Sequence, residues 1–212
     1  LFYISGVGVD VKTFSPVSME KKMSYRKDYG YNTNDFIIIS VAEFNKNKNQ
    51  RLIIEAIEKI LKKHRNIKVL FVGIGPKLEE IKSVVSKCSL HDQISFLGYR
   101  RDVDILLKIS DLFVACSIRE GLGIAAIEAI ATGLPIVASD NRGHRDLIKN
   151  GRNGFLISVY DPESFSDRIE VVFNSKDIRK QFSINNIKGI NKFSDENIIA
   201  KMKNIYFDII QT

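Results

Sequence analysis

The stretch 111–135 constrains the fold of this chain more than any other. It begins with a short apolar run, 111–115, of the length of a buried strand. Gly121 and Gly123 then mark a loop, residues 124–131 are apolar or good helix formers, and a Gly-Leu-Pro sequence follows where that helix should end. The order strand, glycine loop, helix, strand predicts one βαβ unit. The start of its helix would offer free N–H groups to an anion.

Two carboxylates frame this unit. Glu120 lies in the predicted loop, and Glu128 lies on the predicted helix eight residues further along. That separation is about 12 Å along a helix, on the order of the span of a sugar diphosphate. Glu128 belongs to an otherwise apolar segment, where an unpaired carboxylate is costly. The pair is open to two interpretations, a solvated helix edge or a ligand site, and the neighbouring glycines favour the site.

The rest of the chain alternates apolar runs with amphipathic segments and loops. Strands are predicted at Phe36–Val41, Ile67–Val72, Ile94–Leu97, Leu112–Ala115, Ile136–Ala138 and Gly154–Ser158. Helices are predicted at Gln50–Lys63, from Pro76 onward, at Asp102–Ile109, Ile124–Ala131, Pro162–Lys188 with a break near Lys176, and Ser194–Ile210. A loop rich in Asn, Arg and Gly is predicted after Ala138. This alternation predicts a Rossmann-like α/β fold, a parallel sheet of about six strands with helices on both faces.

Bulk composition bounds the class of protein. With 212 residues, of which 44% are hydrophobic and 27% charged, the chain is long enough for a sizeable core. No apolar run approaches the roughly 18 residues that a transmembrane helix needs. Leu1–Ile4 is too short for a signal peptide and is predicted to be a truncated strand. Cys88 and Cys116 show no metal-binding or redox spacing, so reduced thiols in a cytoplasmic protein are expected.

The net charge of +7 leaves several kinds of partner open. Nucleoside diphosphates, an anionic membrane surface and nucleic acid all attract a basic protein, and most of the lysines also fit a merely solvated surface. No predicted strand interleaves aromatic and basic residues as nucleic-acid-binding strands do. We therefore expect no nucleic-acid partner.

Polar residues gather where the predicted strands end. Ligands of parallel α/β sheets bind beyond the carboxyl ends of the strands. Five predicted loops at that edge carry the polar residues, and the opposite edge has none of comparable density. The loops contain, in chain order, Asn45–Lys48, Gly73 and Gly75, Tyr99 and Arg100, Ser117–Gly123, and Asn141–His144. The sequence therefore predicts a binding cleft at the carboxyl edge.

Ordered motifs run through nearly the whole chain. The central stretch reads Ser-x-x-Glu-Gly-x-Gly from Ser117, followed by Glu-Ala-x-Ala-x-Gly-x-Pro from Glu128. The flanking motifs are Lys48-Asn49, Gly73-Ile74-Gly75-Pro76, Phe96-Leu97-Gly98-Tyr99-Arg100 and Gly151-Arg152-Asn153-Gly154-Phe155. Together they resemble the signature of the family 4 (group 1) retaining glycosyltransferases. The variants Lys46–Asn49 and Arg142–Asp146 most resemble the branch that builds bacterial capsular and exopolysaccharides.

The resemblance implies the C-terminal, donor-binding half of a GT-B fold. It divides the chain into three parts. Residues 1–16 would lead in from an absent N-terminal acceptor domain, and residues 17–190 would form the nucleotide-sugar-binding domain. Residues 191–212 would form a helix that packs back on the absent domain. The implied reaction moves a hexose or N-acetylhexosamine from a nucleoside-diphosphate sugar, most commonly UDP-linked, to a lipid-linked saccharide. The implied setting is the bacterial cytoplasm, with peripheral membrane contact as one option. Without its partner domain the chain is expected to be inactive.

The resemblance also assigns roles to residues. In the resembled family, the residue at Lys48 binds the diphosphate, the one at Glu120 contacts donor-sugar hydroxyls, and the one at Glu128 holds the ribose diol. Because the leaving diphosphate gathers negative charge, the protein should supply positive charge there. Glu120 and Lys48 are the predicted catalytic residues, and no metal or other cofactor is implied. The predicted donor-binding residues are Glu128, Gly121, Leu122, Gly123, Ile124, Ala125, Tyr99, Arg100, Gly73, Gly75 and Asn45.

Glu43 departs from the family pattern, which usually has Arg at this position, five residues before the lysine. A Glu aimed at the phosphates would repel them, so Arg119 or Lys46 could compensate, or Glu43 could orient Lys48. His144 is expected to be a loop residue rather than a catalytic base. Two other functions are left open, a related enzyme such as a sugar-nucleotide epimerase or phosphorylase, and a nucleotide-binding module without catalysis.

Overall fold

The structure, a computed structural model, describes residues 7–210. Leu1–Ile4, predicted as a truncated strand, and the first six residues of the predicted lead-in segment lie outside the described residues. None of the helices described between residues 7 and 210 is both long and apolar enough to cross a membrane.

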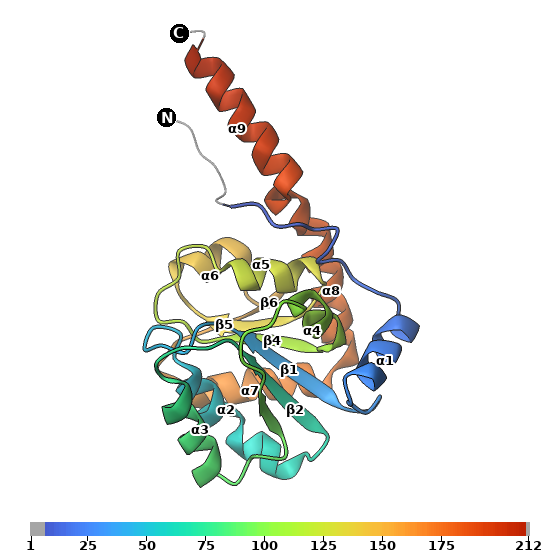
Figure 1. Ribbon diagram of the computed structural model, residues 1–212, viewed down its shortest axis with the longest axis vertical. Helices are drawn as coiled ribbons and strands as arrows, with labels where there is room; N and C mark the ends of the chain where they lie inside the picture. The colour runs from blue at the N-terminus through green and yellow to red at the C-terminus, as the bar shows by residue number, and fades with distance from the viewer. Residues whose placement is uncertain (1–6, 211–212) are drawn as a thin grey trace.

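A parallel sheet of six strands forms the centre of the molecule (Figure 1). Its strand order is β3-β2-β1-β4-β5-β6, and every pairing is parallel. The strands are β1 (Phe36–Val41), β2 (Ile67–Val72), β3 (Ile94–Phe96), β4 (Leu112–Ala115), β5 (Ile136–Ser139) and β6 (Gly154–Ile157). All six lie where the apolar runs predict them, with ends that differ by at most one residue. The predicted fold class is confirmed.

The helices agree with the sequence pattern in most places. They are α1 (Met19–Asp28), α2 (Gln50–Lys63), α3 (Leu78–Lys87), α4 (Val103–Ile109), α5 (Ile124–Ala131), α6 (Arg142–Leu147), α7 (Pro162–Asn174), α8 (Lys176–Gly189), η1 (Ile190–Phe193) and α9 (Asp195–Ile210). Two predictions are wrong. Pro76 lies in a turn before α3 rather than at its first position, and the predicted loop after β5 contains the short helix α6.

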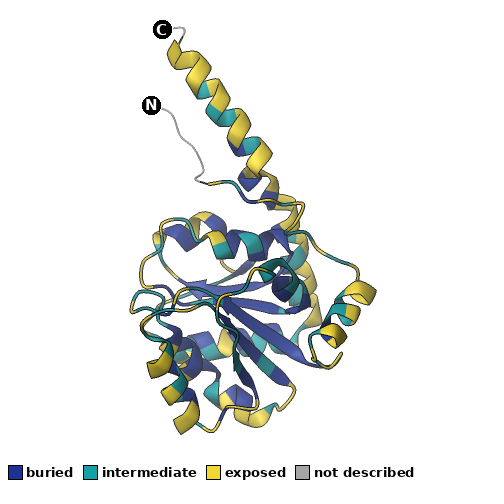
Figure 2. Ribbon diagram, viewed as in Figure 1, coloured by how far each residue is buried: buried dark blue, intermediate teal, exposed yellow. Residues whose placement is uncertain are grey.

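Successive strand residues face two separate cores. In β1, Phe36 and Ile38 pack into the core beneath α2, α3 and α7, whereas Ile37 and Ile39 pack into the core beneath α4, α5 and η1. The strands are therefore buried on both faces, and the outer helices carry the exposed residues (Figure 2). The helix α9 extends away from the sheet (Figure 1), and five of its large apolar side chains are exposed, Ile199, Tyr206, Phe207, Ile209 and Ile210.

The strand order reverses direction between β1 and β4. From β1 the chain moves outward to β2 and β3, then returns to β4 and continues outward to β5 and β6 on the other side. The loops after β1 and β4 therefore diverge to opposite sides of the sheet, which opens a crevice at the carboxyl edge between them. Lys48 belongs to the first of these loops and Glu120 to the second.

Candidate functional site

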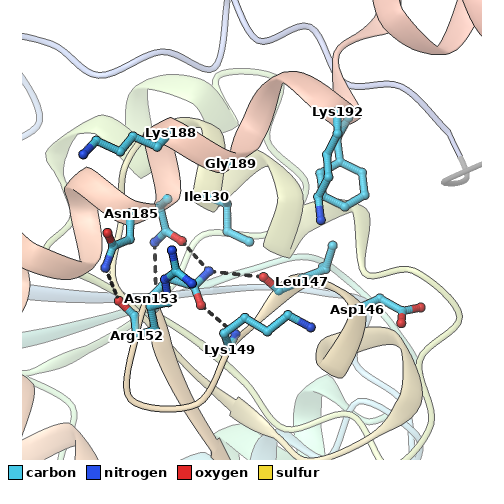
Figure 3. A pocket seen from close by; sticks show the side chains of 12 residues that line it. Ile130, Asp146, Leu147, Lys149, Arg152, Asn153, Asn185, Lys188, Gly189 and Lys192 are labelled. Atoms are coloured by element: carbon cyan, nitrogen blue, oxygen red, sulfur yellow. Dashed lines mark hydrogen bonds between the residues drawn. The ribbon is translucent and has the colours of Figure 1, made fainter.

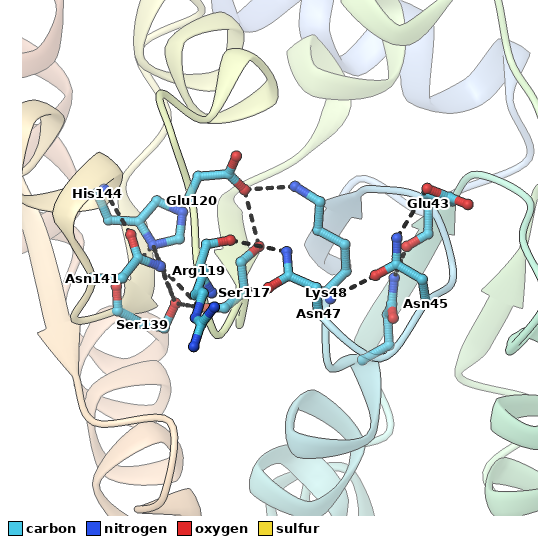
Figure 4. A network of polar contacts seen from close by, with 11 residues as sticks. Glu43, Asn45, Asn47, Lys48, Ser117, Arg119, Glu120, Ser139, Asn141 and His144 are labelled. Atoms are coloured by element: carbon cyan, nitrogen blue, oxygen red, sulfur yellow. Dashed lines mark hydrogen bonds and ion pairs between the residues drawn. The ribbon is translucent and has the colours of Figure 1, made fainter.

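An ion pair joins the two loops at this switch point. The Lys48 Nζ donates to Oε2 of Glu120 at 2.5 Å, and the Ser117 hydroxyl donates to the same oxygen at 3.1 Å. Figure 4 shows the Lys48 and Glu120 side chains pointing toward one another from separate loops. The two side chains are 26% and 15% exposed, so a ligand at the crevice can still reach them. The two predicted catalytic residues are thus in contact, although they are 72 residues apart in the chain.

Asn47 joins these two loops through three hydrogen bonds. Its carbonyl oxygen accepts from the Ile118 N–H at 2.7 Å, and its side-chain oxygen accepts from the Arg119 N–H at 3.0 Å. The Asn47 amide donates in return to the Arg119 carbonyl at 2.9 Å. These bonds fix the backbone on either side of the Lys48–Glu120 pair. Sequence reasoning missed this role, since an Asn in a polar loop is indistinguishable from an ordinary turn residue.

His144 is part of the site's support. It lies on α6 and is almost completely buried, so the expectation of a loop residue is wrong. Its Nδ1 is 2.8 Å from the Ser139 carbonyl oxygen. Because a carbonyl oxygen can only accept a hydrogen bond, Nδ1 carries a proton, and the ring is neutral when Nε2 is unprotonated. Burial is the main reason why the pKa of His144 is lowered. A neutral imidazole here packs against the site without adding charge.

The start of α6 also anchors the loop that carries Glu120. The Gly143 N–H donates to the Glu120 carbonyl at 3.1 Å. The Asn141 side chain caps α6 by accepting from the His144 N–H at 3.0 Å, and it donates to the Ser117 carbonyl at 2.9 Å (Figure 4). The Ser139 hydroxyl donates to the same carbonyl at 2.5 Å. The β5–α6 junction therefore fixes both ends of the Ser117–Glu120 turn.

The helix α5 begins beside the ion pair. Gly123 precedes it with a φ of 72°, a left-handed conformation that glycine adopts without strain, and provides no side-chain cap. The first amides of α5 are thus available to an anion. A hollow of about 40 Å³ lies between Lys48, Glu120 and the start of α5. Ligand sites usually enclose roughly 300–1,000 Å³, so a ligand of that size would extend beyond this hollow across the open edge.

The charge of Glu120 is stabilised by its neighbours. Burial raises the pKa of this carboxyl, but the hydrogen bond and positive charge of Lys48 outweigh that effect, so the pKa lies below its usual value. Glu120 is therefore ionised near neutral pH. Both of its hydrogen bonds reach Oε2, and among the described residues Oε1 accepts none. That oxygen remains available to a ligand hydroxyl.

Glu128 lies about one turn after the start of α5, in a different environment from Glu120. Its carboxyl is half-buried and has no hydrogen bond or ion pair among residues 7–210. Burial raises its pKa to about 7. The carboxyl thus has no partner within the described residues, and the structure does not bring Glu128 into contact with Glu120 or Lys48.

Glu43 does not reach the Lys48 ammonium. Its exposed carboxylate accepts from the Asn45 amide at 2.9 Å, and the Asn45 side-chain oxygen accepts from the Lys48 N–H at 2.9 Å. Of the alternatives for Glu43, indirect orientation of the Lys48 backbone agrees with these contacts. Lys46 and Arg119 have exposed side chains on the same two loops.

Gly73 and Gly75 serve packing between loops. A Cβ on Gly73 would lie 2.0 Å from the Ala42 carbonyl oxygen, and one on Gly75 would lie 2.5 Å from the Phe44 carbonyl oxygen. Both residues also have positive φ, 140° and 154°. They let the loop after β2 rest on the loop that leads to Lys48. Their predicted role as donor-binding residues stays a prediction.

Tyr99 and Arg100 lie apart from the ion pair. The Tyr99 side chain is 71% exposed. The Arg100 guanidinium is held by Asp102 through two bonds of 2.8 and 2.6 Å, and Tyr29 donates to that carboxylate at 2.5 Å. Arg100 is thus held in an ion pair, although its side chain is still 37% exposed, and the predicted donor-binding role of both residues stays a prediction.

Metal-binding geometry is absent from the described part of the chain. No group of three or more His, Cys, Asp and Glu side chains within residues 7–210 could hold an ion. The sequence does contain one Asp-x-Asp, Asp102-Val103-Asp104, but Arg100 and Tyr29 contact the first carboxylate and Lys108 pairs with the second at 2.9 Å.

One expectation about the opposite edge is wrong. Polar residues also gather at the amino ends of β4 and β5, in a hollow of about 550 Å³. Its cationic lining residues are Lys22, Lys108, Lys176, Arg179 and Lys180. They belong to three different helices, which the sequence does not show to be neighbours.

Comparisons with known proteins agree with the fold and the motifs. The family model described as "Glycosyl transferases group 1" matches residues 21–189. A putative glycosyltransferase of Bacillus subtilis, EpsD, is 34% identical over 203 residues, which cover 96% of this chain and 53% of the relative. The UDP-Gal:alpha-D-GlcNAc-diphosphoundecaprenol alpha-1,3-galactosyltransferase of Escherichia coli is 31% identical over 206 residues, again 96% of this chain and 53% of the relative.

Comparison with solved structures also supports the fold described above. The crystal structure of Anabaena HepE in complex with UDP-glucose superimposes with a TM-score of 0.85 at 21% identity, covering 97% of this chain and 56% of that one. This chain spans about half the length of the curated relatives it matches.

Proposed function

This chain belongs to the group 1 glycosyl transferases, and we propose that it binds the nucleoside-diphosphate sugar of a retaining enzyme. The proposed donor is UDP-linked and carries a hexose or N-acetylhexosamine. The proposed acceptor is a lipid-linked saccharide in the synthesis of a bacterial surface polysaccharide. The enzyme would act in the cytoplasm, at the inner face of the plasma membrane.

The contact between Lys48 and Glu120 at the β1/β4 switch point carries this proposal. In the transfer, the bond between the anomeric carbon and the diphosphate oxygen breaks, and the diphosphate leaves with the bonding electrons. The oxygen of an acceptor hydroxyl would form the new bond to the anomeric carbon, and its proton would pass to the departing diphosphate. Lys48 and the first amides of α5 would stabilise that charge. The free Oε1 of Glu120 would accept from hydroxyls of the donor sugar. Glu128, further along α5, would accept from the ribose diol.

The relatives support this choice of substrates. Anabaena HepE binds UDP-glucose in its crystal structure. The Escherichia coli relative is named for a UDP-galactose donor and a diphosphoundecaprenol-linked acceptor. In this chain, Lys48 and Glu120 at the carboxyl edge would contact the diphosphate and the sugar of such a donor. The acceptor would be held mainly by a second domain.

Calorimetric titration with a panel of nucleoside diphosphates tests the proposal. UDP should bind more tightly than GDP and ADP, and a chelator should not change its affinity. Removing a charged hydrogen bond costs about 1.5–3 kcal/mol, so Lys48→Ala should weaken UDP binding by roughly 10- to 150-fold. Lys59→Ala, an exposed lysine on α2, is the matched control and should have no effect. An unchanged affinity in Lys48→Ala would exclude the proposed phosphate site.

A second titration separates the roles of the two carboxylates. Glu128→Ala should weaken UDP and UDP-sugar alike, because both ligands contain the ribose. Glu120→Ala should weaken the UDP-sugar by about 1.5–3 kcal/mol while the affinity for UDP stays nearly the same. Equal losses for both ligands in both variants would contradict the assignment.

The 212-residue chain is also expected to bind donor without efficient transfer. Positioning two reactants contributes roughly 7–11 kcal/mol to catalysis, and the proposed acceptor domain would supply that positioning. Turnover by the chain and by a protein of the relatives' full length should be compared with the same donor and a lipid-linked acceptor extract. Comparable rates would contradict the proposal that a second domain positions the acceptor.

A further inference from the structure

The helix α8 lies at the amino edge of the sheet, where it borders two basic hollows. Its first half lines the hollow of about 550 Å³ with Lys176, Arg179 and Lys180. Its second half lines a second hollow, of about 250 Å³, with Lys188. Because the six strands are parallel, this edge is opposite the edge that carries Lys48 and Glu120.

The cations in the first hollow fall into two groups. Lys22, Lys108 and Arg179 have partners in the protein, respectively Asp111 at 2.7 Å, Asp104 at 2.9 Å, and the carbonyl oxygens of Val172 and Phe173 at 2.5 and 2.6 Å. Lys176 and Lys180 are exposed, and their side chains form no hydrogen bond or ion pair within residues 7–210. Their ammonium groups are therefore free to bind an external anion.

The placement of Lys176 and Lys180 is unfavourable for the helix itself. They lie four residues apart, so their like charges are neighbours on one helix face. Lys176 is also the first residue of α8, where the helix dipole disfavours a positive charge. Asp177 follows Lys176 but is not within ion-pair distance of either lysine. A bound anion would reduce both the repulsion between the two lysines and the unfavourable interaction of Lys176 with the helix dipole.

The second hollow, shown in Figure 3, is also lined by cations. Lys149 and Lys192 lie on opposite sides of it, and Arg152 and Lys188 are the other cations in its lining. Its lining contains one carboxylate, Asp146. The two hollows therefore have cations along both halves of α8, on the loop between α6 and β6, and on η1.

Apolar side chains are exposed among these cations. Met19, at the rim of the first hollow, is 68% exposed, and Ile184 and Ile187 of α8 are 37% and 41% exposed. Lysines beside exposed aliphatic side chains suit the boundary between lipid headgroups and acyl chains. Surfaces for single-stranded nucleic acid instead use aromatic stacking platforms, and the lining of the first hollow has no aromatic residue.

We propose that this α8 face binds a bilayer rich in acidic phospholipids. Lys176 and Lys180 would contact the headgroup phosphates, with Lys188 and Lys192 extending the contact along the same edge. This inference assigns a surface to the peripheral membrane location in the proposed function. Donor binding and bilayer binding use opposite edges of the sheet, so either one can fail in experiment while the other stands.

Vesicle cosedimentation of the 212-residue chain tests the surface. The chain should pellet with phosphatidylcholine vesicles that contain about one-third phosphatidylglycerol, and not with phosphatidylcholine alone. Raising the salt from about 0.1 M to about 0.5 M should release it. Each basic residue near an acidic bilayer strengthens partitioning by roughly fivefold, so the double variant Lys176→Gln/Lys180→Gln should partition about thirtyfold more weakly.

A matched pair of lysines on another helix is the control. Lys59 and Lys63 of α2 have the same spacing and are exposed, but their hollow also contains Glu55, Glu163, Asp167 and Glu170. The variant Lys59→Gln/Lys63→Gln should lose less than threefold in partitioning, and both double variants should keep the affinity of the wild type for UDP. An equal loss in the two double variants would overturn the proposal. So would retention of the chain on single-stranded RNA without any binding to acidic vesicles.

Discussion

Two lysine–carboxylate clusters lie at opposite edges of the same sheet, and they differ in how completely their hydrogen-bonding groups are used. At the amino edge, Asp111 accepts from Lys22 at 2.7 Å, from Arg26 at 2.5 Å and from the Ile37 N–H at 2.8 Å. Arg26 donates its remaining bonds to backbone carbonyls, among them those of Ile109 and Asp35. At the carboxyl edge, the residues that the structure describes contact only one of the two carboxylate oxygens of Glu120.

The difference separates a structural ion pair from a candidate site. Arg26 is only 3% exposed, and both oxygens of Asp111 are occupied, so this cluster ties α1 and the β4 terminus to β1 and has little capacity for a ligand. The Lys48–Glu120 pair is also partly buried, yet one carboxylate oxygen and most of the ammonium protons remain available. Burial and charge alone would not distinguish the two clusters.

The largest expected effect is on stability, from breaking the amino-edge cluster. Asp111→Asn leaves Arg26 and Lys22 without a counter-charge, and removing one partner of a buried pair costs about 3–5 kcal/mol of unfolding free energy. Urea unfolding should show this loss, while the affinity for UDP stays unchanged. The control Glu58→Gln removes the partly exposed carboxylate that pairs with Lys62 on the surface of α2 and should cost less than about 0.5 kcal/mol. If Asp111→Asn lost UDP affinity but not stability, the amino-edge cluster would be a ligand site rather than a structural ion pair.

A smaller, pH-dependent effect is expected at Glu128. Burial raises its pKa from the usual 4.5 to about 7 in the folded chain. Between these values the folded protein binds a proton that the unfolded chain has released, so wild-type stability falls as the pH rises through this window. For a fully buried carboxyl this shift would correspond to about 3 kcal/mol, and solvent screening reduces that value at the half-buried Glu128. Glu128→Gln should therefore be more stable than wild type by about 1–2 kcal/mol at pH 8 and equally stable near pH 4. Thermal unfolding at the two pH values measures this difference, and a gain of the same size at both would contradict it.

The smallest expected effect concerns the exposed charge of Glu43. Glu43→Gln keeps an acceptor for the Asn45 amide but removes a negative charge near the proposed diphosphate site. An exposed charge interaction is worth about 0.5–1 kcal/mol, so UDP should bind roughly two- to fivefold more tightly, and added salt should narrow the difference. Weaker UDP binding by this variant would show that the carboxylate assists the site.

The sequence predicted the sheet and most of its helices because these depend on local patterns. Continuous apolar runs placed all six strands, and the glycine-flanked stretch placed α5. The six-residue helix α6 was missed because it is too short to show a period of apolar residues. Its burial of His144 follows from long-range packing rather than from neighbouring residues.

The site was predicted in part for similar reasons. Lys48 and Glu120 could be assigned to one edge because parallel strands end at a common edge, but their direct contact depends on the strand order. The role of Asn47 depends on two loops meeting. The basic hollow at the amino edge combines residues of α1, α4 and α8, whose proximity no local pattern encodes.

A crystal structure of the 212-residue chain with UDP tests the central claim most directly, because it shows which edge holds the diphosphate. The predicted result places the phosphate oxygens within about 3 Å of the Lys48 ammonium and of the first amides of α5. A diphosphate bound beside α8, among Lys176 and Lys180, or a crevice at the β1/β4 switch point that stays empty at saturating UDP, would contradict it.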